Sequence, residues 1–196
     1  MSTSTIDASS ADDARERWTA VFIGVLAVLL AICSMGGGNA SKDGDRANID
    51  ATNTWAFFQA KNIRRQSIRL AADDLDLRLR TEPGLSPEAR AAIEAKVKEY
   101  QDQAQKLTTD PERKEGLDEL YAKGKQLEAA RDAAMARDPY FDWAQAFLQI
   151  AIVIASVSIV SRSRMLIALA AALGLAGTLL MLDGFTMLVR LPLLST

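Results

Sequence analysis

The chain contains no histidine and a single cysteine, Cys33, among its 196 residues. The absence of histidine removes the commonest general base and the commonest metal ligand of proteins. One cysteine cannot form a disulfide within the chain. The remaining residues offer no nucleophile with a base beside it. The sequence therefore predicts a protein that is not an enzyme, with no catalytic residue, no cofactor and no metal site.

An excess of either charge is also lacking, because 23 Lys and Arg stand against 25 Asp and Glu, for a net charge of −2. Without a strongly basic face, nucleic acid is not expected as a partner. The acidic triplet Asp73, Asp74 and Asp76 would lie along one exposed helix. Adjacent carboxylates on one helix do not enclose a cation, so this triplet predicts no metal site.

Charge is absent from three long stretches, residues 18–38, 143–161 and 165–182. At about 1.5 Å per residue, a helix of roughly 20 residues crosses the ~30 Å hydrocarbon core of a bilayer. We therefore expect an all-α membrane protein with transmembrane helices at 18–38, 143–161 and 165–185. The first run is longer than the apolar part of an export signal, so we expect it to be retained as an anchor.

Most of the charge lies in residues 39–142, which hold 18 of the Lys and Arg and 20 of the Asp and Glu. Helix-forming residues dominate there and β-branched residues are scarce. We expect an extramembrane domain of helical hairpin or coiled-coil type between the first and second transmembrane helices. A disordered tail at 1–17 and a C-terminal tail at 186–196 complete the expected organisation.

Capping residues and prolines divide the middle domain into three predicted helices. The first runs from about residue 46 to 81, and the second covers 87–107 after the cap-then-proline start Ser86-Pro87. A similar signal places the start of the third helix near Pro111. Asp138-Pro139 then predicts a kink or a short break before the second transmembrane helix.

The first of these helices carries two apolar rows with the seven-residue spacing of a packing seam. This helix is too long to be covered by the second, so we expect part of it to pack on another copy or a partner. The triplet Gly36-Gly37-Gly38 precedes it and suits a hinge or a close packing point, of which a flexible joint is the favoured interpretation. The two rows are Ile63, Leu70 and Leu77, and Ile68 with Leu75.

An aromatic block near the start of the same helix is the most distinctive local sequence. Aromatic side chains on several sides of one helix, mixed with basic residues, are typical of the centre of a protein interface. In the first transmembrane helix, small residues on one face would allow close helix approach in lipid, within the chain or between copies. The candidate oligomer or partner interface consists of Trp55, Phe57, Phe58, Ile63, Leu70, Gly24 and Ala31.

Three polar residues in or near the later spans form a second candidate set. Gln145 and Gln149 lie four residues apart, on one face of the second span, and Asp183 lies at the end of the third. Polar groups inside a membrane need a partner or a watery crevice. Interhelical hydrogen bonds and a solvated or ion-paired Asp183 are the favoured interpretation, and a polar path through an oligomer is the alternative.

The short basic segments predict the orientation. Arg15 and Arg17 flank the first span, and Arg162 and Arg164 fill the link between the second and third. The positive-inside rule places both segments in the cytoplasm, which puts the N-terminus inside and residues 39–142 in the periplasm.

Three sequence blocks carry a resemblance to a known family. The blocks are Trp55 to Ile63, Leu148 to Ser156, and the basic link Arg162 to Arg164. With them, most of residues 18–185 resembles an uncharacterised bacterial membrane family catalogued as domain of unknown function 4337. The resemblance implies a three-span protein of the bacterial inner membrane and no established activity.

Two functional hypotheses follow. The first is a non-enzymatic inner-membrane protein that self-associates through helical packing and acts as a scaffold or accessory subunit. Its partners would be further copies of itself, the lipid bilayer, or another envelope or membrane protein. The alternative is an oligomeric channel or transporter with a path lined by Gln145, Gln149 and Asp183.

Overall fold

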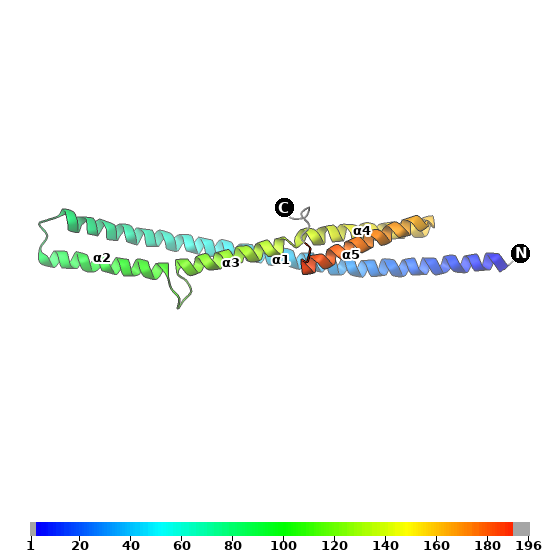
Figure 1. Cartoon of the computed structure of the whole chain (residues 1–196), viewed down its shortest axis with the longest axis horizontal. Helices are drawn as coiled ribbons and strands as arrows, with labels where there is room; N and C mark the ends of the chain where they lie inside the picture. The colour runs from blue at the N-terminus through cyan, green and yellow to red at the C-terminus, as the bar shows by residue number, and fades with distance from the viewer. Residues whose placement is uncertain (1–2, 190–196) are drawn as a thin grey trace. The chain divides into compact units, whose positions relative to one another are not determined.

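The computed structural model describes residues 3–189, which are helical throughout apart from short connections, and no strand occurs among them. The expectation of an all-α protein is thus confirmed. Figure 1 labels the five helices along the chain. They are α1 (Thr3–Thr81), α2 (Pro87–Thr108), α3 (Leu117–Met135), α4 (Asp138–Ser161) and α5 (Arg164–Thr186).

Helix α1 is longer than we expected at its N-terminal end. Residues 3–17, for which we expected a disordered tail, belong to α1, and residues 1–2 lie outside the described residues. Ala14, Arg15 and Glu16 favour the helix and continue it outward from the first apolar run, whereas residues 3–13 are rich in Ser, Thr and Asp, which favour it less. Residues 190–196 of the expected C-terminal tail also lie outside the described part of the chain.

The glycine triplet 36–38 does not interrupt α1, so the favoured flexible joint is absent from this structure. A glycine inside a helix costs about 0.5–1 kcal/mol relative to alanine. Gly36 and Gly37 have a compensating contact, which is close packing on Phe141 of α4, whereas Gly38 has none.

The connections between the later helices confirm one predicted start and correct another. Ser86 caps α2 as expected, with its Oγ accepting a hydrogen bond from the backbone N–H of Ala89 at 3.1 Å. Residues 110–114 form only a single turn, which ends at Lys114 in the left-handed region with φ 55°. Helix α3 therefore begins at Leu117 and not near Pro111. The expected break before Pro139 lies between Met135 and Asp138.

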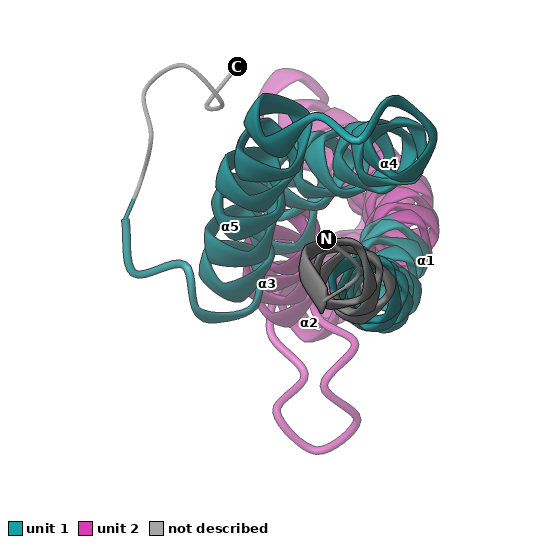
Figure 2. Ribbon diagram, turned by 90° about the vertical axis from the view of Figure 1, so that its right-hand side faces the viewer, with its two compact units in different colours: residues 1–44, 132–196 teal, residues 45–131 magenta. Residues whose placement is uncertain are grey.

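The chain divides into two units, shown in different colours in Figure 2. Unit 1 comprises residues 1–44 and 132–196, and unit 2 comprises residues 45–131. Three helical stretches are long and apolar enough to cross a membrane, namely Arg15–Thr81, Leu117–Ser161 and Arg164–Thr186. Their uncharged portions are the predicted spans.

Unit 1 is built around the first part of α1 together with α4 and α5. Small residues allow the helices to approach closely: Gly174 of α5 lies against Leu26 of α1, and Gly177 lies against Leu148 of α4. The buried core consists of Leu26, Cys33, Ala40, Phe141, Ala144, Leu148, Ala151 and Met181.

Unit 2 contains the later part of α1, all of α2 and most of α3. Helix α2 carries an apolar stripe that becomes covered, with Ala104 buried and the other members half-buried. These other members are Ala89, Ile93, Val97, Tyr100 and Leu107. Near the end of α2, Arg65 of α1 donates a hydrogen bond to the Thr108 hydroxyl at 3.3 Å. Further along, α1 and α3 share an aromatic cluster around Trp55.

Candidate functional site

The glycine triplet forms a close packing point in unit 1. A Cβ on Gly36 would lie 2.6 Å from Phe141 Cε1 and 2.7 Å from Phe185 Cζ, whereas a Cβ on Gly38 would meet nothing within 4 Å. The two phenylalanine rings make an edge-to-face contact at 4.9 Å. The triplet thus lets two aromatic rings fill the space beside α1.

Cys33 lies one helical turn earlier and is completely buried. Its thiol donates a hydrogen bond to the backbone carbonyl of Phe141 at 3.5 Å. A buried thiol with a structural partner acts as a small core residue, so this cysteine offers no reactive group.

The three residues of the candidate polar path lie in different surroundings. Gln145 is half-buried beside Gly37, and Gln149 is exposed one turn further along α4. Asp183 is half-buried, and its Oδ1 accepts the backbone N–H of Val189 at 2.9 Å, just beyond the end of α5. Among residues 15–189, no hydrogen bond joins any two of these three side chains.

The small-residue faces of the spans divide into two kinds. Those of α4 and α5 are covered within the chain, with Ala144, Ala151 and Ala170 at 0% exposure. The small face of α1, which includes Gly24 and Ala31, is exposed, and nothing lies within 4 Å of a Cβ built on Gly24. Among the small-residue faces of the described spans, only that of α1 is therefore open to another molecule.

Two of the candidate interface residues pack inside unit 2. Trp55 makes edge-to-face contacts with Phe58 and with Tyr121 of α3, both at 5.6 Å between ring centroids. Trp55 Nε1 donates a hydrogen bond to Glu128 at 2.9 Å. Gly124 makes room for the indole, because a Cβ there would lie 2.8 Å from the ring.

This cluster includes two residues, Gly124 and Glu128, that the sequence analysis did not single out. An isolated glycine within a helical pattern signals a close approach of another group, and this signal could have identified Gly124. Lys125 donates a hydrogen bond to Glu128 at 2.8 Å. The hydrogen bond from Lys125, and also that from Trp55, lowers the pKa of Glu128 below its ordinary value.

The other three candidate interface residues of unit 2, Phe57, Ile63 and Leu70, are exposed. Ile63 and Leu70 belong to a longer row that we call the outer stripe. The row beside it, Ile68 and Leu75, is half-buried within unit 2. The outer stripe consists of Ile49, Ala56, Ile63, Leu70 and Leu77, which follow one another at intervals of seven.

The outer stripe contains four of the six large apolar side chains that are exposed among the described residues of unit 2. Its four large side chains are 58–69% exposed. Besides them, Phe57 and Tyr121 are the exposed large apolar residues described in unit 2. One helix face thus concentrates apolar groups that none of the described residues covers.

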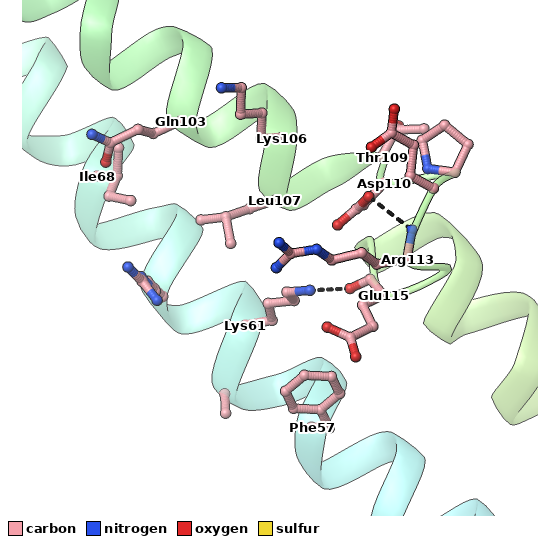
Figure 3. Close-up of a pocket in the computed structure, with 14 residues that line it drawn as sticks. Phe57, Lys61, Ile68, Gln103, Lys106, Leu107, Thr109, Asp110, Arg113 and Glu115 are labelled. Carbon is pink, nitrogen blue, oxygen red and sulfur yellow. Dashed lines mark hydrogen bonds between the residues drawn. The ribbon is translucent and has the colours of Figure 1, made fainter.

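A hollow of about 980 Å³ lies where α1 and α2 meet the connection to α3 (Figure 3). Lys61 reaches from α1 and donates a hydrogen bond to the Glu115 carbonyl, and its ammonium lies 5.2 Å from the Phe57 ring centroid. The Arg113 backbone N–H donates to Asp110 Oδ1 at 3.2 Å. Basic and acidic groups both line the hollow, so it does not present a single charge, and its described lining residues include no nucleophile–base pair.

No group of three or more His, Cys, Asp or Glu side chains suited to a metal ion occurs among the residues that the structure describes. The acidic triplet of α1 is instead engaged in part by its own helix. Asp74 pairs with Arg78 at 3.3 Å, and Asp76 pairs with Arg80.

These features define an all-helical protein with three helices long and apolar enough to cross a membrane. The chain belongs to the family described as domain of unknown function 4337, whose model matches residues 15–187. The resemblance identified from its sequence blocks is therefore confirmed. No curated protein and no solved structure matches the chain.

Proposed function

We propose that this protein is a three-span inner-membrane protein of bacteria that self-associates and acts as a scaffold or accessory subunit. Its N-terminus and the Arg162–Arg164 link lie in the cytoplasm, and residues 39–142 form a periplasmic helical domain. Apolar side chains on the outside of unit 1 support a lipid environment, because they would face hydrocarbon there. They include Val21, Val25, Val28, Val153, Val157, Leu175 and Leu179.

The outer stripe is the observation that carries the proposal. A charged domain outside the membrane has no lipid to cover a row of apolar side chains, so the row must be covered by protein or remain costly to expose. Trp55 and Phe58 already pack inside unit 2 and support its fold. The self-association surface therefore shifts to Ile63 and Leu70, with the open small face of α1 as a second contact inside the membrane.

The double variant Ile63→Ser and Leu70→Ser tests this proposal. Both side chains are more than 60% exposed, so the fold of one copy should tolerate the change. We expect the wild-type particle to have a mass that is a multiple of 21.3 kDa, and the variant to shift towards a single chain. Light scattering or native mass spectrometry of detergent-held protein measures the mass.

The matched control is Lys98→Ser together with Gln101→Ser, because both residues are exposed on α2 and lie off the stripe. The control should keep the wild-type mass. A monomeric wild type, or an assembly unaffected by the double variant, would contradict this assignment.

An oligomeric channel or transporter is the second candidate. The exposed amide of Gln149, within an otherwise apolar helix, favours it, since such a group in lipid needs a polar neighbour. In an assembly, Gln149 would line the path with Gln145, and Asp183 would lie at its mouth. Conductance of purified protein in planar bilayers distinguishes the two functions, because a scaffold leaves the bilayer silent.

A further inference from the structure

A groove of about 330 Å³ lies between α1 and α5 in unit 1. The hydroxyl of Thr19, one of its lining residues, donates a hydrogen bond to the Arg15 carbonyl at 2.9 Å and is satisfied within its own helix. Most of the wall is therefore apolar, and Arg15 is its only charged member. The lining consists of Arg15, Trp18, Thr19 and Phe22 of α1 with Ile167 and Ala171 of α5.

The two helices close one end of the groove. A Cβ on Gly174 would lie 2.8 Å from Leu26 Cδ2 and 3.8 Å from Phe22 Cζ, so α5 packs directly on α1 at this level. Ala171, three residues earlier on α5, lines the groove instead. The groove therefore begins beside this contact and extends towards Arg15.

Helical spacing places a second arginine on the groove side of α5. Arg15 and Phe22 are seven residues apart on one face of α1, and Arg164 and Ala171 are seven apart on one face of α5. Side chains of a helix tilt towards its N-terminus. Both arginines therefore extend away from the closed end of the groove.

The open end lies at the level expected for the headgroups of a bilayer. Arg15 and Arg164 come just before the uncharged stretches 18–38 and 165–182. Trp18, which is 75% exposed, lies at the same level, and tryptophan is enriched where hydrocarbon meets headgroups. A molecule that fits this groove has an apolar chain and, at one end, a group that accepts hydrogen bonds from arginine.

The charges beside the groove indicate that this group is a phosphate. Residues 15–22 and 162–171 contain four arginines and one acidic residue, Glu16, while Asp12 and Asp13 lie about one turn further out along α1. Arginine pairs strongly with phosphate oxygens through charge-assisted hydrogen bonds. Basic pockets between transmembrane helices accordingly bind lipid headgroups.

We propose that the groove between α1 and α5 binds one phospholipid. An acyl chain lies along Phe22, Ile167 and Ala171, and the headgroup phosphate lies at Arg15, with Arg164 as a second cation beside it. The inference rests on the membrane location proposed above and does not depend on self-association or on the orientation of the chain.

Lipid retention by the detergent-held full chain tests this inference. The protein is loaded with equal amounts of phosphatidylglycerol and of a diacylglycerol with the same acyl chains, which lacks only the phosphate headgroup. After gel filtration in lipid-free detergent, mass spectrometry of the extract measures what remains bound. We expect about one phosphatidylglycerol per chain, in roughly tenfold excess over diacylglycerol, because only the phosphate forms charge-assisted hydrogen bonds.

Two variants separate the phosphate contact from the apolar wall. Arg15→Gln should abolish the excess of phosphatidylglycerol, and Arg17→Gln, at an exposed position outside the lining, should keep it. Ala171→Phe should fill the groove and lower the retention of both lipids. Its control is Ala172→Phe, the same change at the next residue, which is also exposed and lies outside the lining.

Three results would overturn the inference. Equal retention of the two lipids by the wild type would remove the phosphate contact. Unchanged lipid content in Ala171→Phe, together with a lower particle mass, would mean that another copy occupies the groove. Protein that alkaline carbonate releases from membranes would overturn the proposed membrane location as well, whereas the first two results leave that location standing.

Discussion

At the scale of single residues, the glycines show how position decides the effect of one methyl group. Gly36 and Gly38 lie two residues apart in the same uninterrupted helix. Gly36 is buried against Phe141 and Phe185, whereas Gly38 is exposed with open space beside it. The same substitution should therefore have opposite effects at the two sites.

Gly36→Ala should destabilise the protein by about 1–3 kcal/mol, because the new Cβ overlaps two aromatic rings in a packed core. Gly38→Ala should stabilise it by up to about 1 kcal/mol, since alanine favours the helix over glycine. Unfolding of detergent-held protein followed by circular dichroism measures both. Equal stabilisation by the two variants would mean that the Phe141 packing is wrong.

Glu128 is a residue of unit 2 whose ionisation should affect the stability of the fold. The hydrogen bond from Lys125, and then that from Trp55, lowers the pKa of Glu128 in the folded state. A carboxyl whose folded pKa is lowered stabilises the fold above its unfolded pKa, and this stabilisation is lost as the pH falls through the folded value. Unit 2 should therefore lose stability on acidification below about pH 4.5.

Glu128→Gln tests this dependence, because the amide oxygen can still accept the Trp55 N–H but carries no charge. We expect the variant to be less stable than wild type at pH 7 and to lose less stability between pH 6 and pH 3. Thermal unfolding across this pH range measures the difference. Glu94→Gln, at an exposed α2 position, should keep the wild-type pH dependence, and an identical effect at both sites would refute the assignment.

At the scale of the elements, the sequence predicted what local chemistry determines. Absence of charge located the apolar portions of α1, α4 and α5, and Ser86-Pro87 located the start of α2. The start near Pro111 was wrong although its signal was similar. There Lys114 adopts the left-handed conformation and ends the turn. A helix start signal marks where a helix can begin but does not show whether the following residues continue it.

What the sequence could not supply is the choice between alternative partners. Two apolar rows run along α1 with the same spacing, and only the positions of α2 and α3 decide that Ile68 is covered and Ile63 is not. The same holds for Trp55, which the sequence placed at an intermolecular interface. Its partners Tyr121 and Glu128 are more than 60 residues away in the chain, where no periodicity connects them.

At the scale of the whole molecule, the remaining proposal is the orientation in the membrane. The argument depends on charge, because Arg15, Arg17, Arg162 and Arg164 all flank the spans in short segments. The positive-inside rule weighs such segments heavily and discounts long domains such as residues 39–142. The structure supports the topology with an odd number of helices able to cross a membrane in residues 15–189.

A cysteine at Lys98 and one at Ser163 would therefore lie on opposite sides of the membrane. We expect Lys98→Cys to react with a membrane-impermeant maleimide in intact spheroplasts, and Ser163→Cys to react only after permeabilisation. The native chain is the control, because its single thiol is fully buried and should remain unlabelled. The reverse pattern would invert the orientation, and labelling of both sites from outside would contradict a span between them. The reverse pattern would also move the outer stripe out of the periplasm, where the proposed self-association places it.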